Sequence, residues 1–151
     1  MFHIIDNTES IRTLLVEIIQ NTGQEAQSFA SPDDYFKNVF SDDFIKPMAV
    51  ITDERLPNMT GYQMMEIVLV LYPDINFAVI SGEGSIDCHF KDKVCMYLVK
   101  PFRPEMIEEM VDKFTRCYAE GASSTIGCGV FGDKPRSGVN NGACPKLISM
   151  K

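Results

Sequence analysis

MAVITDERLPNMTG, residues 48–61, is the stretch that decides how this chain folds. It opens with a short apolar run, residues 49–51, which has the length of a buried strand in a parallel sheet. The run ends at the carboxylate of Asp53, and the turn-forming residues Pro57 and Gly61 follow. Open α/β sheets place their chemistry at the carboxyl ends of their strands. The sequence therefore singles out Asp53 as the centre of a candidate site.

Further apolar runs alternate with helical patterns over residues 1–119. Strands are expected over residues 2–5, 25–29, 48–52, 75–80 and 95–99. Helices are expected to begin at residues 9, 32, 61 and 104, with one or two helical turns within residues 86–92. Strands that are apolar throughout and alternate with helices indicate a parallel sheet covered on both faces. Right-handed crossovers favour the strand order 2-1-3-4-5, which is a doubly wound, flavodoxin-like α/β fold.

Local signals refine three of these helices. Thr8 is a candidate N-cap of the first helix, and Ser31 is expected to cap the second, with Pro32 in its first turn. The helix over residues 61–72 is expected to turn one apolar face to the core, made of Met64, Ile67, Val68 and Leu71.

The predicted strand order brings polar residues together at one edge of the sheet. Strand ends supply Asp6, Asn7, Asp53, Ser81 and Lys100. Clustered carboxylates require a cation or a raised pKa, and oxygen ligands of this kind suit Mg²⁺. A lysine and a hydroxyl opposite an acid can bind a tetrahedral anion. An aspartate in such company can act as a nucleophile toward phosphorus.

At this point the residues match a family. The pieces IIDNTESIR, ITDERLPNMTG, VISGEG and MYLVKPF follow one another in order over residues 4–12, 51–61, 79–84 and 96–102. With these pieces, residues 1–119 resemble the receiver domain of two-component response regulators. The resemblance implies that Asp53 accepts a phosphoryl group from a histidine kinase or a phosphotransfer protein. It implies a Mg²⁺ site formed by Asp6, Asn7, Asp53 and the backbone carbonyl of Arg55.

The resemblance also implies roles around the phosphoryl group. Ser81 would hydrogen-bond it, Lys100 would pair with it, and Tyr97 would turn inward as an aromatic switch. The Lys100–Pro101 peptide bond would be cis. Pro57 and Gly61 would shape the loop after the phosphoacceptor. The domain would then be a signalling switch that transfers and loses its own phosphoryl group, not a conventional enzyme, and its changed face would meet a downstream protein or a second copy.

Three features depart from the family pattern. Asn7 stands where a second acid is usual, which removes one negative charge and predicts weaker Mg²⁺ binding. Ser81 and Lys100 are 19 positions apart, fewer than is usual, so the fourth helix is expected to be short or irregular. Gly82 and Arg55 occupy positions that tune phosphoryl lifetime in the family: Gly82 leaves the site open, and Arg55 could reach across it.

Two alternatives to a phosphorylated switch follow from these departures. The first is a degenerate receiver, a binding or dimerisation module that takes no phosphate, which Asn7 and the shortened fourth helix favour. The second is a Mg²⁺-dependent phosphatase-type hydrolase of similar fold. That class generally needs a second acid two positions after the nucleophile, and Arg55 occupies that position here.

Composition narrows the class of protein. The 151 residues suit one domain, no apolar run is long enough to span a membrane, and no signal peptide is visible, so a cytoplasmic location is expected. Residues 1–119 hold 10 basic and 19 acidic residues, a net charge of about −9. A surface this acidic disfavours direct contact with nucleic acid.

The last part of the chain differs in kind. Residues 120–151 are rich in Gly, Ser, Asn and Pro and have little periodicity. They are expected to form an irregular extension and not a separate domain. Two alternatives stay open: disorder, or packing of Val130–Phe131 and Leu147–Ile148 on the domain. The five cysteines show no CxxC pair and are expected to be free thiols.

Overall fold

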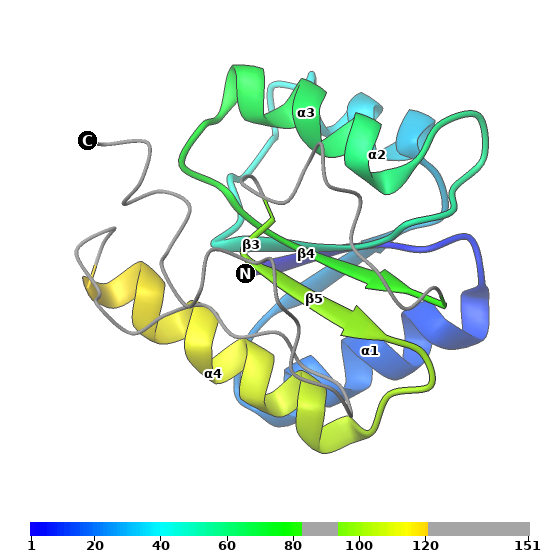
Figure 1. Cartoon of the computed structure of the whole chain (residues 1–151). Coiled ribbons are helices and arrows are strands. Elements are labelled where there is room, and N and C mark those ends of the chain that lie inside the picture. The colour runs from blue at the N-terminus through cyan, green and yellow to red at the C-terminus, as the bar shows by residue number, and fades with distance from the viewer. Residues whose placement is uncertain (83–93, 121–151) are drawn as a thin grey trace.

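The computed structural model of the chain describes residues 1–82 and 94–120, in which a central sheet carries helices on both faces (Figure 1). The strands of this described part are β1 (Phe2–Ile5), β2 (Ala26–Phe29), β3 (Ala49–Asp53), β4 (Asn76–Ser81) and β5 (Met96–Val99). All neighbouring strands are parallel, and their order is β2-β1-β3-β4-β5. The predicted doubly wound, flavodoxin-like fold is confirmed, and each strand lies within one residue of its expected bounds.

The helices of the described residues form a layer on each face of the sheet. They are α1 (Glu9–Asn21), α2 (Pro32–Val39), α3 (Gly61–Leu71) and α4 (Pro104–Glu120). α1 and α4 contact each other on one face, while α2 and α3 lie together on the other. The helical turns expected within residues 86–92 and the irregular C-terminal extension lie outside the described residues.

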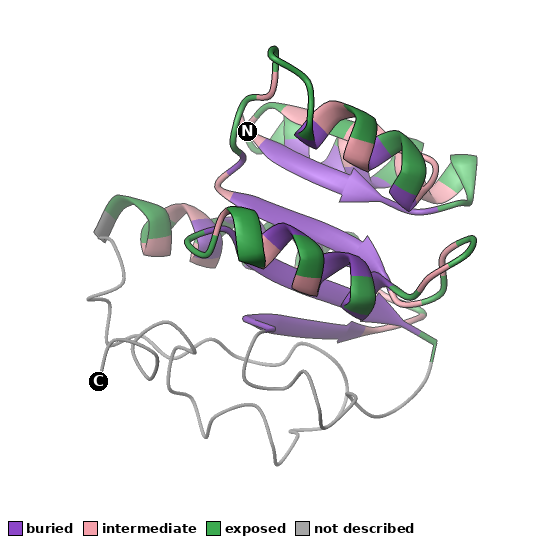
Figure 2. Cartoon of the chain, turned by 90° about the horizontal axis from the view of Figure 1, so that it is seen from above, coloured by how far each residue is buried: buried purple, intermediate pink, exposed green. Residues whose placement is uncertain are grey.

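β1, β3 and β4 are buried on both faces, which explains their mostly apolar sequences, whereas the edge strand β2 is only partly buried (Figure 2). Successive residues point to opposite sides of the sheet. The side facing α1 and α4 receives Ile4, Ile51, Ile80 and Leu98. The side facing α2 and α3 receives Ile5, Val50, Val79 and Tyr97. Burial of each large apolar side chain contributes about 1.5–3 kcal/mol, so these two clusters dominate the stability of the fold.

The two expected helix caps differ in outcome. Ser31 caps α2 as predicted, because its hydroxyl accepts a hydrogen bond from the Asp34 backbone N–H at 3.1 Å. Thr8 occupies the N-cap position of α1, but its side chain makes no capping hydrogen bond. Its backbone N–H donates instead to Asp6 Oδ1 at 2.7 Å. The start of α1 is therefore tied to the candidate site and not to its own cap.

The predicted buried face of α3 is partly wrong. Met64 and Val68 are buried, but Ile67 and Leu71 are 43% and 45% exposed, and Met65 is buried instead. The reason lies at the first residue of the helix. A Cβ on Gly61 would lie 2.2 Å from the Asp53 carbonyl oxygen, so Gly61 must face the sheet. The residues three, four and seven positions later then face the sheet as well.

Two cysteines, Cys95 and Cys117, fall in the described part of the chain, and no disulfide joins them there. The other three lie outside the described residues. In the same part of the chain, the helices are too short or too polar for any of them to cross a bilayer.

Candidate functional site

The carboxyl ends of four neighbouring strands meet at one edge of the sheet. β3 ends at Asp53 and β4 at Ser81, while Asp6 and Lys100 directly follow β1 and β5. Parallel pairing in the order β1-β3-β4-β5 brings all four ends to the same edge. The predicted gathering of these residues is therefore observed, whereas the role of each in phosphoryl chemistry stays a prediction.

Lys100 joins the two acids of the site. Its ammonium nitrogen lies 3.1 Å from Asp53 Oδ1 and 3.6 Å from Asp6 Oδ2. The Asp53 and Asp6 side chains are 10% and 2% exposed, whereas the Lys100 side chain is 29% exposed. The lysine therefore reaches from the solvent side over two nearly buried carboxylates. The Lys100–Pro101 peptide bond is cis.

The Asp53 carboxyl has an altered proton affinity. Burial raises its pKa above the ordinary value, and the negative charge of Asp6 acts in the same direction. The hydrogen bond and positive charge of Lys100 oppose this rise without cancelling it. Two carboxylates share the single positive charge of Lys100, so the site carries excess negative charge, which is the electrostatic condition for binding a further cation.

The other predicted metal ligands lie in different surroundings. Asp6 is fixed by the Thr8 backbone N–H on Oδ1, and its carbonyl accepts a hydrogen bond from Arg12 Nη1 at 2.8 Å. Asn7 is exposed to solvent directly after it. Arg55 is exposed, and its backbone forms a bridge with Thr60 that closes the loop between β3 and α3.

The side-chain atoms that could bind a metal at this edge of the sheet fit Mg²⁺. They are oxygen atoms only, with the two carboxylates of Asp6 and Asp53 sharing Lys100. Mg²⁺ usually takes one or two carboxylates and keeps several waters. In the described residues, His, Cys, Asp and Glu form no group of three that could hold a metal. A site here therefore depends on the two carboxylates together with amide, carbonyl and water oxygens.

The sequence prediction missed Glu54. Its carboxylate accepts a hydrogen bond from the Ser81 hydroxyl, on the β4 side of Asp53. Its backbone N–H donates to the Ile80 carbonyl at 2.9 Å, which holds Glu54 beside the end of β4. The available signal was a second acid directly after Asp53, at a strand end that parallel pairing places next to Ser81. Ser81 was expected to face a phosphoryl group, and in this structure its hydroxyl is bonded to Glu54.

The loop from Asp53 to α3 is shaped by a few specific residues. Gly61 donates its backbone N–H to the Glu54 carbonyl at 2.8 Å and leaves no room for a side chain. Thr60 and Gln63 form a capping box at the start of α3, which the sequence prediction also missed. Asn58 has a φ of 71°, a left-handed conformation that asparagine tolerates better than most residues. Pro57 is exposed in this loop.

Tyr97 and Gly82 complete the predicted set. Tyr97 is fully buried on the α2 and α3 side of the sheet. Its proposed movement as a switch stays a prediction. Gly82 is exposed, and a Cβ added there would meet no atom within 4 Å. The position next to Ser81 therefore has room for a side chain, and its effect on the phosphoryl group stays a prediction.

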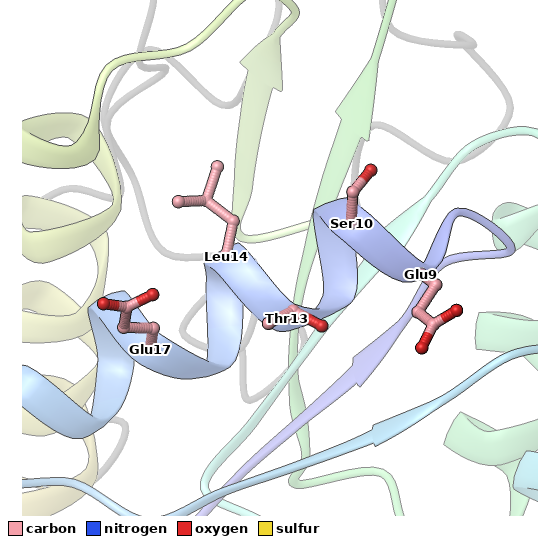
Figure 3. A pocket seen from close by; sticks show the side chains of 5 residues that line it. All are labelled: Glu9, Ser10, Thr13, Leu14 and Glu17. Carbon is pink, nitrogen blue, oxygen red and sulfur yellow. The ribbon is translucent and has the colours of Figure 1, made fainter.

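A hollow of about 470 Å³ lies on the surface of α1. Figure 3 shows its lining side chains along α1 from the first residue of that helix onward, and these are Glu9, Ser10, Thr13, Leu14 and Glu17. The helix starts three residues after Asp6. The hollow therefore lies beside the strand-end site and does not contain it.

Comparison with known proteins decides the family. The family model described as the response regulator receiver domain matches residues 2–112. The chain belongs to this family. Receiver domains of this family are signalling switches of two-component systems and not conventional enzymes.

Individual proteins agree with this assignment. The receiver is 23% identical over 120 residues to the DNA-binding transcriptional regulator NtrC of Proteus hauseri, and this match covers 78% of the chain but 25% of NtrC. The chain thus spans about a quarter of that curated relative. A receiver domain structure from Clostridium thermocellum has a TM-score of 0.70 at 18% identity, covering 79% of this chain and 96% of that one. The response regulator TrrA of Thermotoga maritima, solved in complex with Mg²⁺ and BeF, has a TM-score of 0.62 at 22% identity, with 75% and 96% covered.

Proposed function

We propose that this receiver is switched by phosphorylation of Asp53. The phosphoryl group would come from a histidine kinase or a histidine phosphotransfer protein. The observation that carries the proposal is the position of Lys100, whose ammonium lies 3.1 Å from Asp53 Oδ1. A carboxylate paired with a lysine at the edge of a parallel sheet can attack phosphorus while the lysine balances charge on the phosphoryl oxygens.

The chemical step uses groups of this chain at stated atoms. An Asp53 carboxylate oxygen attacks the phosphorus of the donor's phosphohistidine, the P–N bond breaks, and the imidazole leaves with its electron pair. The product is an acyl phosphate, which water later hydrolyses to restore Asp53. Mg²⁺ bound by Asp6, Asp53, Asn7 and the Arg55 carbonyl would supply positive charge to the transferred phosphoryl group. Lys100 supplies the protein's own share of that charge.

Partners are proposed from the surfaces around the site. The hollow on α1 begins close to Asp6 and is a suitable surface for the phosphodonor protein. The output would pass to a downstream protein or a second copy of the chain through the surface near Tyr97 and α4. The excess of acidic residues favours protein partners over nucleic acid, and we propose a cytoplasmic receiver that spans residues 1–119.

Intact mass spectrometry tests the proposal directly. The chain is incubated with acetyl phosphate and Mg²⁺, and the expected product carries one added phosphoryl group. Asp53→Asn should abolish the addition, whereas Asp33→Asn, an exposed acid at the start of α2, should leave it unchanged. Addition that persists in Asp53→Asn would place the phosphoacceptor elsewhere.

A degenerate receiver that takes no phosphate is the second candidate. Two observations favour it: Asn7 replaces an acid, and the Ser81 hydroxyl is bonded to Glu54. Absence of any added phosphate, with the chain folded and Mg²⁺ present, would select this candidate over the first.

A further inference from the structure

Glu54 is held against the side of the site that would receive the phosphoryl oxygens. Asp53 and Glu54 are consecutive, and the strand order puts β1 with Asp6 on one side of β3 and β4 with Ser81 on the other. The Glu54 carboxylate lies toward β4, because it accepts the Ser81 hydroxyl hydrogen bond. It therefore lies away from the Asp6 side, where the metal ligands gather.

The Ser81 hydroxyl can serve one acceptor at a time. A serine hydroxyl carries a single O–H donor, although it has two acceptor lone pairs. A phosphoryl oxygen and a carboxylate oxygen both require that donor. Ser81 is 1% exposed, and its carbonyl accepts a hydrogen bond from the Lys100 backbone N–H at 2.8 Å, so its main chain is fixed in place. The donor must therefore leave Glu54 before it can reach a phosphoryl group on Asp53.

Charge acts in the same direction as hydrogen bonding. A phosphoryl group adds about 1.5–2 negative charges at neutral pH. Glu54 directly follows Asp53, and in the described part of the chain no ion pair joins Glu54 to a basic side chain. The hydrogen bond between the Glu54 carboxylate and Ser81 is thus compatible with an unphosphorylated Asp53. Repulsion from the added phosphoryl charge disfavours this hydrogen bond once Asp53 is phosphorylated.

We propose that Glu54 is a positioning residue that holds the Ser81 hydroxyl in the unphosphorylated state and competes with the phosphoryl group for it. The inference rests on the proposed phosphorylation of Asp53. Glu54 slows phosphorylation and shortens the phosphorylated state, and its release from Ser81 is a step of the switch. A charge-assisted hydrogen bond of this kind corresponds to about a tenfold change in an equilibrium constant or more.

The test compares variants of Glu54 under saturating Mg²⁺ and acetyl phosphate. Glu54→Ala removes both the acceptor and the charge, and we expect its phosphorylation rate and its affinity for beryllofluoride to rise about tenfold. Glu54→Gln keeps an oxygen acceptor without the charge, so its values should lie between those of Glu54→Ala and the parent. Glu25→Ala is the matched control, because Glu25 is exposed beside the amino end of β1, away from the site.

A double-mutant cycle separates competition for Ser81 from simple charge repulsion. In a Ser81→Ala background there is no hydroxyl to compete for. The increase in phosphorylation rate caused by Glu54→Ala should then shrink to the part that comes from the loss of the negative charge alone. An undiminished gain in that background would overturn the competition, as would equal rates for Glu54→Ala and the parent chain. Urea unfolding of each variant checks that the fold is retained.

The same experiment distinguishes failure of this inference from failure of the proposed function. If the parent and Glu54→Ala both take no phosphate, phosphorylation of Asp53 is wrong and the inference falls with it. If both are phosphorylated at the same rate, the function stands and the role of Glu54 alone is wrong. If only Glu54→Ala is phosphorylated, the inference about Glu54 stands, whereas the proposed phosphorylation of the parent chain is wrong and the degenerate receiver is selected.

Discussion

The Lys100 ammonium lies 3.1 Å from Asp53 Oδ1, and this pair is the electrostatic centre of the site. Removing the lysine in Lys100→Met leaves two nearly buried carboxylates without their cation. We expect the free energy of unfolding at neutral pH, measured in urea with EDTA, to fall by about 1–3 kcal/mol. Lys37→Met is the control, since the Lys37 side chain is 80% exposed and its pairing with Asp34 should contribute little. Equal losses in the two variants would contradict a special role for Lys100.

Gly61 and Gly82 provide a matched pair for testing the loop geometry. Gly61→Ala would place a methyl group 2.2 Å from the Asp53 carbonyl oxygen, so the loop or α3 must move. We expect a loss of about 1–3 kcal/mol in the free energy of unfolding, which is typical of overpacking. Gly82→Ala meets no atom within 4 Å and should change this quantity by less than about 0.5 kcal/mol. Chemical denaturation of both variants checks the difference, and a harmless Gly61→Ala would refute the close approach of α3 to β3.

His3 is a titratable group enclosed by aromatic rings. It is 1% exposed, its Nδ1 shares a hydrogen bond with the Tyr35 hydroxyl at 3.0 Å, and its ring lies edge-on to Phe29, Tyr35 and Phe44. Burial, helped by the positive N-terminus, lowers its pKa from 6.5 to about 4. The folded state therefore holds His3 neutral over a range of pH in which the unfolded chain protonates it.

The sign of the resulting pH dependence follows from that difference. In the unfolded chain His3 binds a proton below pH 6.5, whereas in the folded chain it binds one only below about pH 4. The stability contributed by neutral His3 is complete above pH 6.5 and is lost as the pH falls toward 4. Between pH 7.5 and 5 the loss is about 2 kcal/mol. His3→Gln should lose less stability than the parent over this interval in urea unfolding, and identical losses would mean that His3 titrates normally.

Asn7 offers a gain-of-function test of the metal site. Asn7→Asp adds a carboxylate directly after Asp6, in an exposed position where little desolvation opposes its charge. We expect tighter Mg²⁺ binding by isothermal titration calorimetry, by about threefold to thirtyfold, because a carboxylate is a stronger ligand for a hard cation than an amide. Asn21→Asp, at the opposite end of α1, is the matched control. No gain in Asn7→Asp over Asn21→Asp would argue that this position is not a ligand.

The strands and the site residues at their ends could be predicted because their signals are local. Residues 49–51 form an apolar run that ends at a carboxylate, and this order of residues survives in the structure as β3 and Asp53. Because crossovers between parallel strands are right-handed, the order of the elements along the chain was enough to place Asp6, Ser81 and Lys100 at the same edge. The rotation of α3 could not be predicted in this way, because Ile67, Leu71 and Met65 are all apolar and the periodicity does not choose among them.

The sequence by itself determined which elements form, their order in the sheet and the edge at which Asp53 lies, because short-range apolar patterns and chain topology set these features. The tertiary structure alone decided which hydrogen bonds and close contacts the side chains at that edge make. The close approach of Gly61 to the Asp53 carbonyl oxygen sets which face of α3 is buried, and this face differs from the predicted one. The Ser81 hydroxyl donates its hydrogen bond to Glu54. One contact joins β3 to α3, and the other joins the residue after β3 to the end of β4, so both depend on how the packed layers fit together and not on spacing along the chain.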